Sequence, residues 1–69
     1  MPESTYKIIE IVGTSKNSWG DAARNAVETA SKTITDLRIA EVVKLDMTIE
    51  GGKIALYRAR ISVSFKYQE

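Results

Sequence analysis

Residues 37–67, LRIAEVVKLDMTIEGGKIALYRARISVSFKY, decide the fold of this 69-residue chain. From 37 to 49 the odd positions are mostly apolar, and the same alternation returns from 55 to 67. The polar residues at even positions of the first segment are Arg38, Lys44, Asp46 and Thr48. A period of two is typical of strands whose two faces have different surroundings, so the pattern predicts two long antiparallel strands.

A turn signal, Glu50-Gly51-Gly52-Lys53, separates the two segments and predicts a β-hairpin. A plain two-residue Gly51-Gly52 loop would pair odd positions with even ones and mix apolar and charged side chains on each face. The pattern therefore argues against that loop. An odd-length loop, or a bulge in either strand, would restore the pairing of apolar with apolar residues.

The N-terminal half predicts one more strand and a helix. Thr5–Val12 is rich in β-branched and aromatic residues and stops at Gly13. Ser18, with Asp21 three residues later, resembles a capping box that opens a helix at Trp19. The apolar stripe of this helix, expected to run for four or five turns, comprises Trp19, Ala22, Ala23, Ala26, Val27, Ala30, Ile34 and Leu37. The prediction is a single α+β domain over residues 1–69, with β-α-β-β order and a three-stranded antiparallel sheet packed on one amphipathic helix.

Composition restricts both stability and function. The chain has no cysteine and no histidine, which removes disulfides, common zinc sites and the usual nucleophilic catalytic systems. A monomer of this size buries too little apolar surface to be more than marginally stable, so self-association is expected. The net charge of +1 argues against a dedicated nucleic-acid binder, as does the expected burial of Tyr57, Phe65 and Tyr67. With no signal peptide or membrane-spanning segment in view, a cytoplasmic protein is expected.

Five basic residues of the predicted hairpin could attract an anionic ligand: Arg38, Lys44, Arg58, Arg60 and Lys66. The hairpin register also brings Arg58 near Asp46, where the two could form a cross-strand ion pair or orient a ligand. Trp19 is interpreted as a core or subunit-contact residue, because it begins the apolar stripe of the helix.

The chain resembles the dodecins in YKIIEIVGTS at 6–15, in Ser18-Trp19 with the alanine-rich helix, in Asp36-Leu37-Arg38 with Glu41-Val42, and in the closing strand from Tyr57 to Phe65. The resemblance covers essentially the whole chain. It implies a hollow homododecamer of cubic symmetry, a non-enzymatic cage that binds or stores a small molecule.

Flavin-binding dodecins stack the flavin ring on a tryptophan where this chain has Ile39, and bond its polar edge with a glutamine where this chain has Arg58. The resemblance therefore implies that binding of riboflavin or FMN is weakened or lost, because isoleucine offers no π face. The candidate ligand-binding residues are Ile39, Lys44, Asp46, Arg58 and Lys66.

The alternative is a structural cage or one that binds a hard cation such as Ca²⁺. Glu10 and Glu41 are the candidate ligands, because both are acidic within otherwise apolar strand patterns. On a symmetry axis one carboxylate per chain becomes two or three converging ligands.

Overall fold

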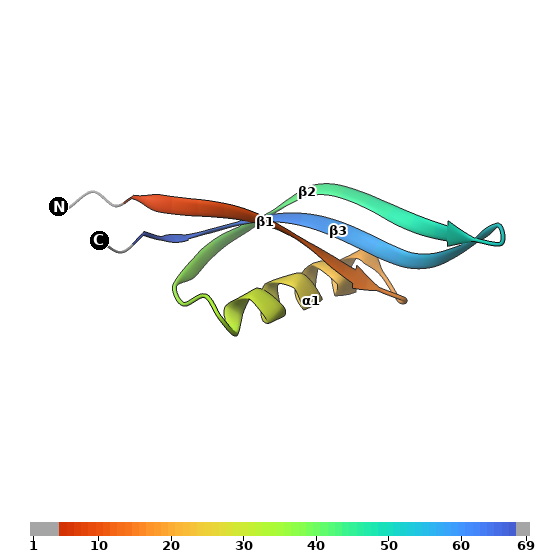
Figure 1. The fold of residues 1–69 in the computed structure, drawn as a ribbon, viewed down its shortest axis with the longest axis horizontal. Coiled ribbons are helices and arrows are strands. Elements are labelled where there is room, and N and C mark those ends of the chain that lie inside the picture. The colour runs from red at the N-terminus through yellow and green to blue at the C-terminus, as the bar shows by residue number, and fades with distance from the viewer. Residues whose placement is uncertain (1–4, 68–69) are drawn as a thin grey trace.

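The computed structural model describes residues 5–67, which form three strands and one helix in the predicted order (Figure 1). β1 spans Tyr6–Ser15, α1 Trp19–Ser31, β2 Leu37–Glu50 and β3 Lys53–Lys66. The strands form one antiparallel sheet in the order β1-β3-β2, and α1 lies against one face of it. The predicted α+β fold is confirmed.

The start of α1 follows the prediction. Ser18 is the N-cap, and its Oγ accepts a hydrogen bond from the Asp21 backbone N–H at 3.0 Å. The Asp21 carboxylate in turn accepts bonds from Ser15 Oγ at 3.1 Å and from Asn17 Nδ2 at 3.4 Å. The turn between β1 and α1 is therefore tied to the first turn of the helix.

The end of α1 comes earlier than the apolar spacing predicts. The helix has 13 residues and stops at Ser31, so Ile34 and Leu37 lie beyond it. The β-branched residues after position 32 disfavour helix, and Asp36 adopts a left-handed conformation with φ of 63° that redirects the chain into β2. The prediction of four or five turns was wrong, because it counted Ile34 and Leu37 as helical on their spacing from the preceding apolar residues.

The hairpin turn contains the two-residue loop that the sequence pattern argued against. Glu50 pairs with Lys53, and Gly51 and Gly52 have positive φ of 58° and 78°, as a tight hairpin turn requires. The parity is restored by a bulge, the second of the two expected solutions. Ile49 pairs with Ile54 but Thr48 pairs with Leu56, which leaves Ala55 as the extra residue.

Two more irregularities, between Leu37 and Ile39 and between Val42 and Lys44, interrupt the pairing of β2 with β3. Each adds one residue to β2 and so moves the side chains that follow to the other face of the sheet. Leu45 pairs with Ala59 on the face covered by α1, whereas Ile39 pairs with Ser64 on the opposite face. The apolar residues at odd positions of β2 therefore do not all lie on the same face of the sheet.

The core is small and built mainly from small side chains. Its buried members are Ala22, Ala26, Ala59, Ile61 and Val63. The alanine stripe lets α1 lie close to the sheet, and a Cβ built on Gly13 of β1 would lie only 2.1 Å from the Ala22 carbonyl oxygen. Close packing of α1 on β1 therefore depends on glycine at position 13.

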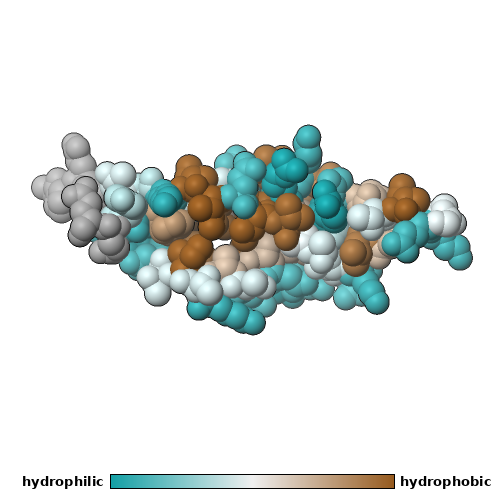
Figure 2. All heavy atoms as spheres, viewed as in Figure 1, coloured by the Kyte–Doolittle hydropathy of each residue, from teal (hydrophilic) through white to brown (hydrophobic). Residues whose placement is uncertain are grey.

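The chain is elongated, and much apolar surface stays uncovered. Its radius of gyration is 14.3 Å, against about 11 Å for a compact domain of this length. Large apolar residues are exposed on all three strands, and hydrophobic atoms are spread over the visible surface (Figure 2). Tyr67, expected to be buried, is 49% exposed because β3 ends at Lys66.

Candidate functional site

The sheet face that α1 leaves uncovered carries all five candidate ligand-binding residues and both candidate cation ligands from the sequence. Residues paired across neighbouring antiparallel strands project to the same face, so the register defines this surface, which we call the open face. Its members are Tyr6, Ile8, Glu10, Val12 and Thr14 of β1, Ile39, Glu41, Lys44, Asp46 and Thr48 of β2, and Leu56, Arg58, Arg60, Ser62, Ser64 and Lys66 of β3.

An acidic row crosses the open face. Ser62 of β3 pairs with Glu10 on one side and with Glu41 on the other. With neighbouring strands about 4.8 Å apart, the two glutamate backbones are roughly 10 Å apart on either side of the Ser62 hydroxyl. Both glutamates are exposed, and neither has an ion-pair partner within residues 5–67. The structure thus brings together the two residues proposed as cation ligands.

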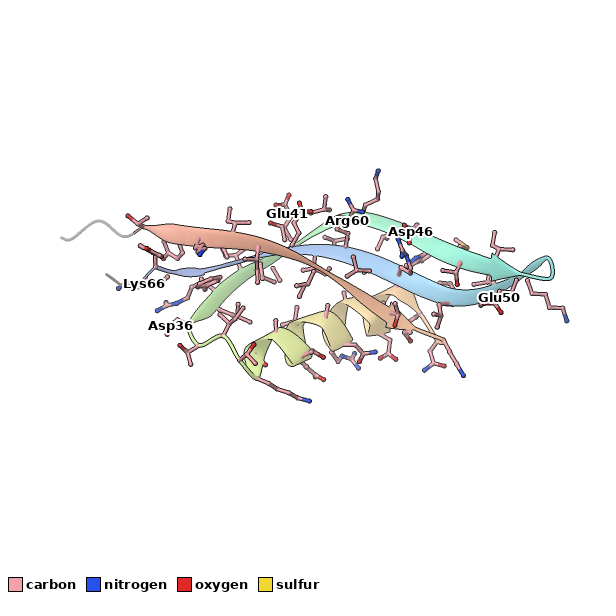
Figure 3. All side chains as sticks on the ribbon, viewed as in Figure 1. Asp36, Glu41, Asp46, Glu50, Arg60 and Lys66 are labelled. Carbon is pink, nitrogen blue, oxygen red and sulfur yellow. The ribbon has the colours of Figure 1, made fainter. Side chains whose placement is uncertain are left out.

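A basic row lies beside the acidic one. Arg60 pairs with Val12 of β1 and with Lys44 of β2. Consecutive rows on one face are about 6.8 Å apart along the strands, so acidic and basic rows are neighbours. Figure 3 shows Glu41 and Arg60 on the side of the sheet away from α1.

Asp46 and Arg58 form the next row as a two-pronged ion pair. Arg58 Nε donates to Asp46 Oδ1 at 2.8 Å, and its terminal nitrogen donates to Oδ2 at 3.1 Å. This contact holds the pKa of the Asp46 carboxyl below its ordinary value and raises the pKa of Arg58. The predicted cross-strand pair is confirmed. Its geometry directs the Arg58 guanidinium toward Asp46.

Trp19 connects α1 to the strand that carries Asp46. Its Nε1 donates to the Asp46 backbone oxygen at 2.8 Å, and its ring meets Tyr57 edge to face with centroids 5.1 Å apart. The main chain of Asp46 is thus held by the helix and its side chain by Arg58. No local signal in the sequence links residues 19 and 46.

Ile39 and Lys66 lie away from the ion pair. Ile39 is 65% exposed and shares a row with Ser64 and Ile8, which makes an apolar band next to the acidic row. Lys66 pairs with Tyr6 at the far end of β3, eight residues from Arg58 and so roughly 27 Å along the strand. Within one chain the structure does not bring Lys66 to the ligand residues expected beside it.

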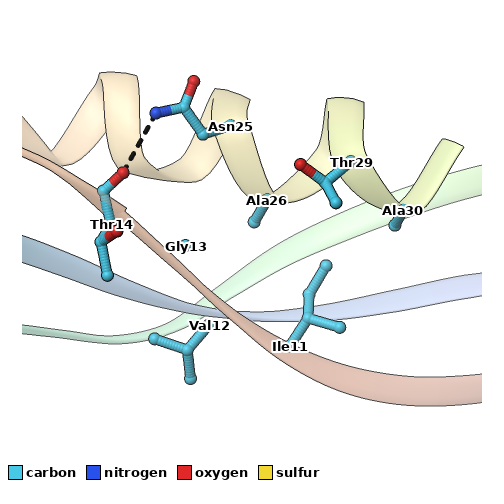
Figure 4. Close-up of a pocket in the computed structure, with 8 residues that line it drawn as sticks. All are labelled: Ile11, Val12, Gly13, Thr14, Asn25, Ala26, Thr29 and Ala30. Atoms are coloured by element: carbon cyan, nitrogen blue, oxygen red, sulfur yellow. Dashed lines mark hydrogen bonds between the residues drawn. The ribbon is translucent and has the colours of Figure 1, made fainter. Parts of the chain in front are cut away.

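The cavities of the single chain lie mostly outside this set of residues. One, of about 400 Å³, lies between β1 and α1, where Asn25 Nδ2 donates to the Thr14 backbone oxygen at 3.0 Å (Figure 4). Another, of about 130 Å³, has Ile39 in its wall together with Val27 and Leu37. That volume is below the roughly 300 Å³ at which small-molecule pockets begin.

Metal-binding groups do not cluster in the part of one chain that the structure describes. Over residues 5–67 no three or more Asp, Glu, His or Cys side chains are grouped so that they could hold a metal ion. Over the same part of the chain, no helix is long and apolar enough to cross a bilayer.

Comparisons with known proteins agree with this geometry. The family model Dodecin matches residues 5–68. A curated relative, calcium dodecin from Mycobacterium tuberculosis, is 43% identical over 63 residues, which cover 91% of this chain and 89% of the relative.

Solved structures are similar over the whole fold. Dodecin from Streptomyces coelicolor superposes with a TM-score of 0.93 at 36% identity, covering 100% of this chain and 99% of that one. Dodecin from Streptomyces davaonensis gives 0.91 at 34% identity, covering 99% and 100%. A crystal structure of M. tuberculosis calcium dodecin, described as having a novel calcium-binding site, gives 0.84 at 45% identity, covering 94% and 93%. From its sequence, its fold and these matches, the chain belongs to the dodecin family.

Proposed function

We propose that twelve copies of this chain form a non-enzymatic binding cage that holds a hard cation such as Ca²⁺, and that its affinity for flavin is weak. The observation that carries the proposal is the acidic row on the open face, in which Glu10 of β1 and Glu41 of β2 each pair with Ser62 of β3. Two carboxylates and a hydroxyl are oxygen ligands of the kind that Ca²⁺ prefers.

Self-association is supported by the incomplete burial of the single chain. A core of five small or medium side chains supports a sheet whose outer strands expose residues such as Ile8, Ile39 and Ile49 to 63–65%. Oligomerisation would cover such surface and supply stability that the monomer lacks.

A shared cation site follows from the geometry of the acidic row. One chain contributes two carboxylates, which is fewer than Ca²⁺ usually takes. A second copy related by a two-fold axis would double the number of ligands. The name of the calcium dodecin relative, 43% identical to this chain, supports the same ligand class.

Weak flavin binding is supported by the two positions where flavin-binding dodecins carry tryptophan and glutamine. Ile39 offers no aromatic face, and Arg58 is already paired with Asp46 through two hydrogen bonds. Of the two lysines among the candidate ligand-binding residues, Lys44 lies in the row next to this pair, and Lys66 would have to come from another copy.

The test has two parts, run on the same preparation. Native mass spectrometry at micromolar concentration should give a mass twelve times that of the chain. Calorimetric titration with Ca²⁺ should show binding that Glu10→Gln or Glu41→Gln weakens at least tenfold.

Glu28→Gln is the matched control, because Glu28 is an exposed glutamate on α1, away from the open face. It should leave Ca²⁺ binding unchanged. A stable monomer would contradict the assembly. Absence of Ca²⁺ binding, or equal losses in all three variants, would contradict the cation site.

A further inference from the structure

The Asp46–Arg58 pair is held in place by more than its own two side chains. The Asp46 and Arg58 side chains are 46% and 38% exposed, and an exposed pair between freely moving side chains contributes little to stability. Here Arg58 binds through Nε and a terminal nitrogen at 2.8 and 3.1 Å, a two-pronged geometry that restricts both groups. The backbone of Asp46 is also fixed, because its oxygen accepts the hydrogen bond from Trp19.

Trp19 is the residue through which α1 holds this part of β2. The helix packs mainly on β1 and β3, and the buried strand residues of the core belong to β3. Trp19 reaches further, with Nε1 at 2.8 Å from the Asp46 oxygen and its ring against Tyr57. The pairing of β2 with β3 shifts after Val42 and again after Thr48, so the regular stretch around Asp46 is short. The contact with Trp19 therefore keeps the Asp46 carboxylate within reach of its partner on β3.

The pair lies beside the basic row of Lys44 and Arg60. None of the ion pairs formed within residues 5–67 includes either of these two residues. The hydrogen bond from Arg58 lowers the pKa of Asp46, and the charges of Arg60 and Lys44 add to this lowering. Asp46 is therefore ionised at neutral pH, and it is the carboxylate that faces the three cations of these two rows.

Without Asp46 the same three cations would form a favourable place for a phosphate group. Arginine binds phosphate oxygens with the two-pronged geometry in which Arg58 binds Asp46. The carboxylate already occupies Nε and one terminal nitrogen of Arg58, and it cancels one of the positive charges. A phosphate would therefore have to displace a carboxylate that is anchored through its own backbone.

We propose that Asp46 blocks phosphate-bearing ligands from Arg58, and that Trp19 is the positioning residue that keeps Asp46 in this place. The inference rests on the proposed weak binding of flavin. It names the residues that prevent the phosphate of FMN from compensating for the missing aromatic contact. Ile39 affects the flavin ring, which riboflavin and FMN share, whereas Asp46 and Trp19 act on the phosphate alone.

Modification of arginines by phenylglyoxal, mapped by mass spectrometry, tests the inference without a flavin. Arg60 is exposed and lies two residues away on the same strand, so it is the internal reference. Relative to Arg60, Arg58 should react about tenfold faster in Asp46→Asn than in wild type. The gain should be about threefold in Trp19→Phe, which keeps an aromatic ring but loses the Nε1 donor. Inorganic phosphate, compared with chloride at equal ionic strength, should slow modification of Arg58 in Asp46→Asn but not in wild type.

Two flavins that differ by one phosphate give a second measurement. In fluorescence quenching at low salt, the affinity for FMN relative to riboflavin should be about tenfold higher in Asp46→Asn than in wild type. Trp19→Phe should raise this ratio by a smaller factor. Because exposed charges are screened over about 8 Å at physiological ionic strength, the gain should shrink as salt is added.

Tyr57→Phe is the matched control. It removes a hydroxyl from the other ring of the aromatic contact and leaves the hydrogen bond from Trp19 to Asp46 unchanged. It should match wild type both in the modification rates and in the ratio of the two flavin affinities.

The outcomes separate the two residues from each other and from the proposed function. If Arg58 keeps its wild-type reactivity in Asp46→Asn, or if phosphate protects it equally in both proteins, Asp46 does not block the site. If Trp19→Phe leaves Arg58 unchanged, or speeds Arg58 and Arg60 equally, Trp19 is not a positioning residue. Tight binding of riboflavin by wild type would contradict the proposed function, whereas the modification rates would still decide this inference.

Discussion

Gly13→Ala should strongly destabilise the protein, because the new methyl group meets the backbone of α1. A Cβ at position 13 would lie 2.1 Å from the Ala22 carbonyl oxygen and 2.7 Å from Ala26 Cβ. Ordinary contact begins near 3.4 Å, whereas the new Cβ would lie 2.1 Å from the carbonyl oxygen. The helix must therefore move by about 1.3 Å, the difference between these two distances. A backbone oxygen cannot rotate away as a side chain can, so the strain is relieved only by moving the whole helix.

The expected cost is about 3 kcal/mol, the upper end for overpacking a well-filled core. Proteins of this length have a total stability of roughly 3–10 kcal/mol, so a large part of it would be lost. Displacing α1 also separates the alanine stripe from Ile61 and Val63, where the core has few contacts to spare.

Urea denaturation followed by circular dichroism, at one fixed protein concentration, measures this loss. Gly20→Ala is the matched control, because a Cβ at Gly20 would have Ser18 Oγ as its nearest neighbour at 4.0 Å. Alanine is also favoured over glycine within a helix, so Gly20→Ala should be neutral or stabilising by about 0.5–1 kcal/mol. A Gly13→Ala protein within about 0.5 kcal/mol of wild type, a range typical of surface changes, would refute the argument.

Three further results are expected. Gly52→Val should destabilise the hairpin by about 1–2 kcal/mol, because φ is 78° there, and urea denaturation should show Gly52→Asn to be milder. Because Arg58 lowers the pKa of Asp46, this pair stabilises the folded protein at pH values above the ordinary aspartate pKa, and this stabilisation is lost as the pH falls through the lowered pKa. Carboxyl NMR titration should show that the pKa of Asp46 rises toward 3.8 in Arg58→Gln. Ile39→Trp combined with Arg58→Gln should raise flavin affinity at least tenfold in fluorescence quenching, and an unchanged affinity would show that these two positions do not control the site.

Local sequence determined the number, type and order of the elements. Ser18 and Asp21 are only three residues apart in the chain, and the Asp21 backbone N–H donates to the Ser18 hydroxyl at the helix cap, so their pattern predicts the start of α1. The alternation of β3 survives in the structure, because β3 is the central strand and its odd residues Ala59, Ile61 and Val63 form the core. The open face was partly predictable for the same reason, since Arg58 and Arg60 alternate with those residues.

The register of β2 depended on the tertiary structure. A bulge costs one ladder pairing locally and is retained only if the cross-strand contacts on both sides improve, which a one-dimensional pattern does not reveal. The irregularities after Leu37 and after Val42 move Ile39 to the open face while Leu45 stays on the helix side. They also set Glu41 beside Ser62, opposite Glu10, and so form the acidic row from residues that are 31 positions apart in the chain.

The end of α1 and the hydrogen bond from Trp19 to the Asp46 backbone likewise depend on contacts between residues that are distant in the chain. Ile34 and Leu37 fit the helical spacing, but Ile34 lies in the connection after α1 and Leu37 is the first residue of β2. Asp36 turns the chain between them at positive φ. Sequence by itself determined which residues tend to be strand, helix or turn, because those tendencies depend on near neighbours. Only the tertiary structure decided which of them share a face, because that depends on how each strand is paired along its length.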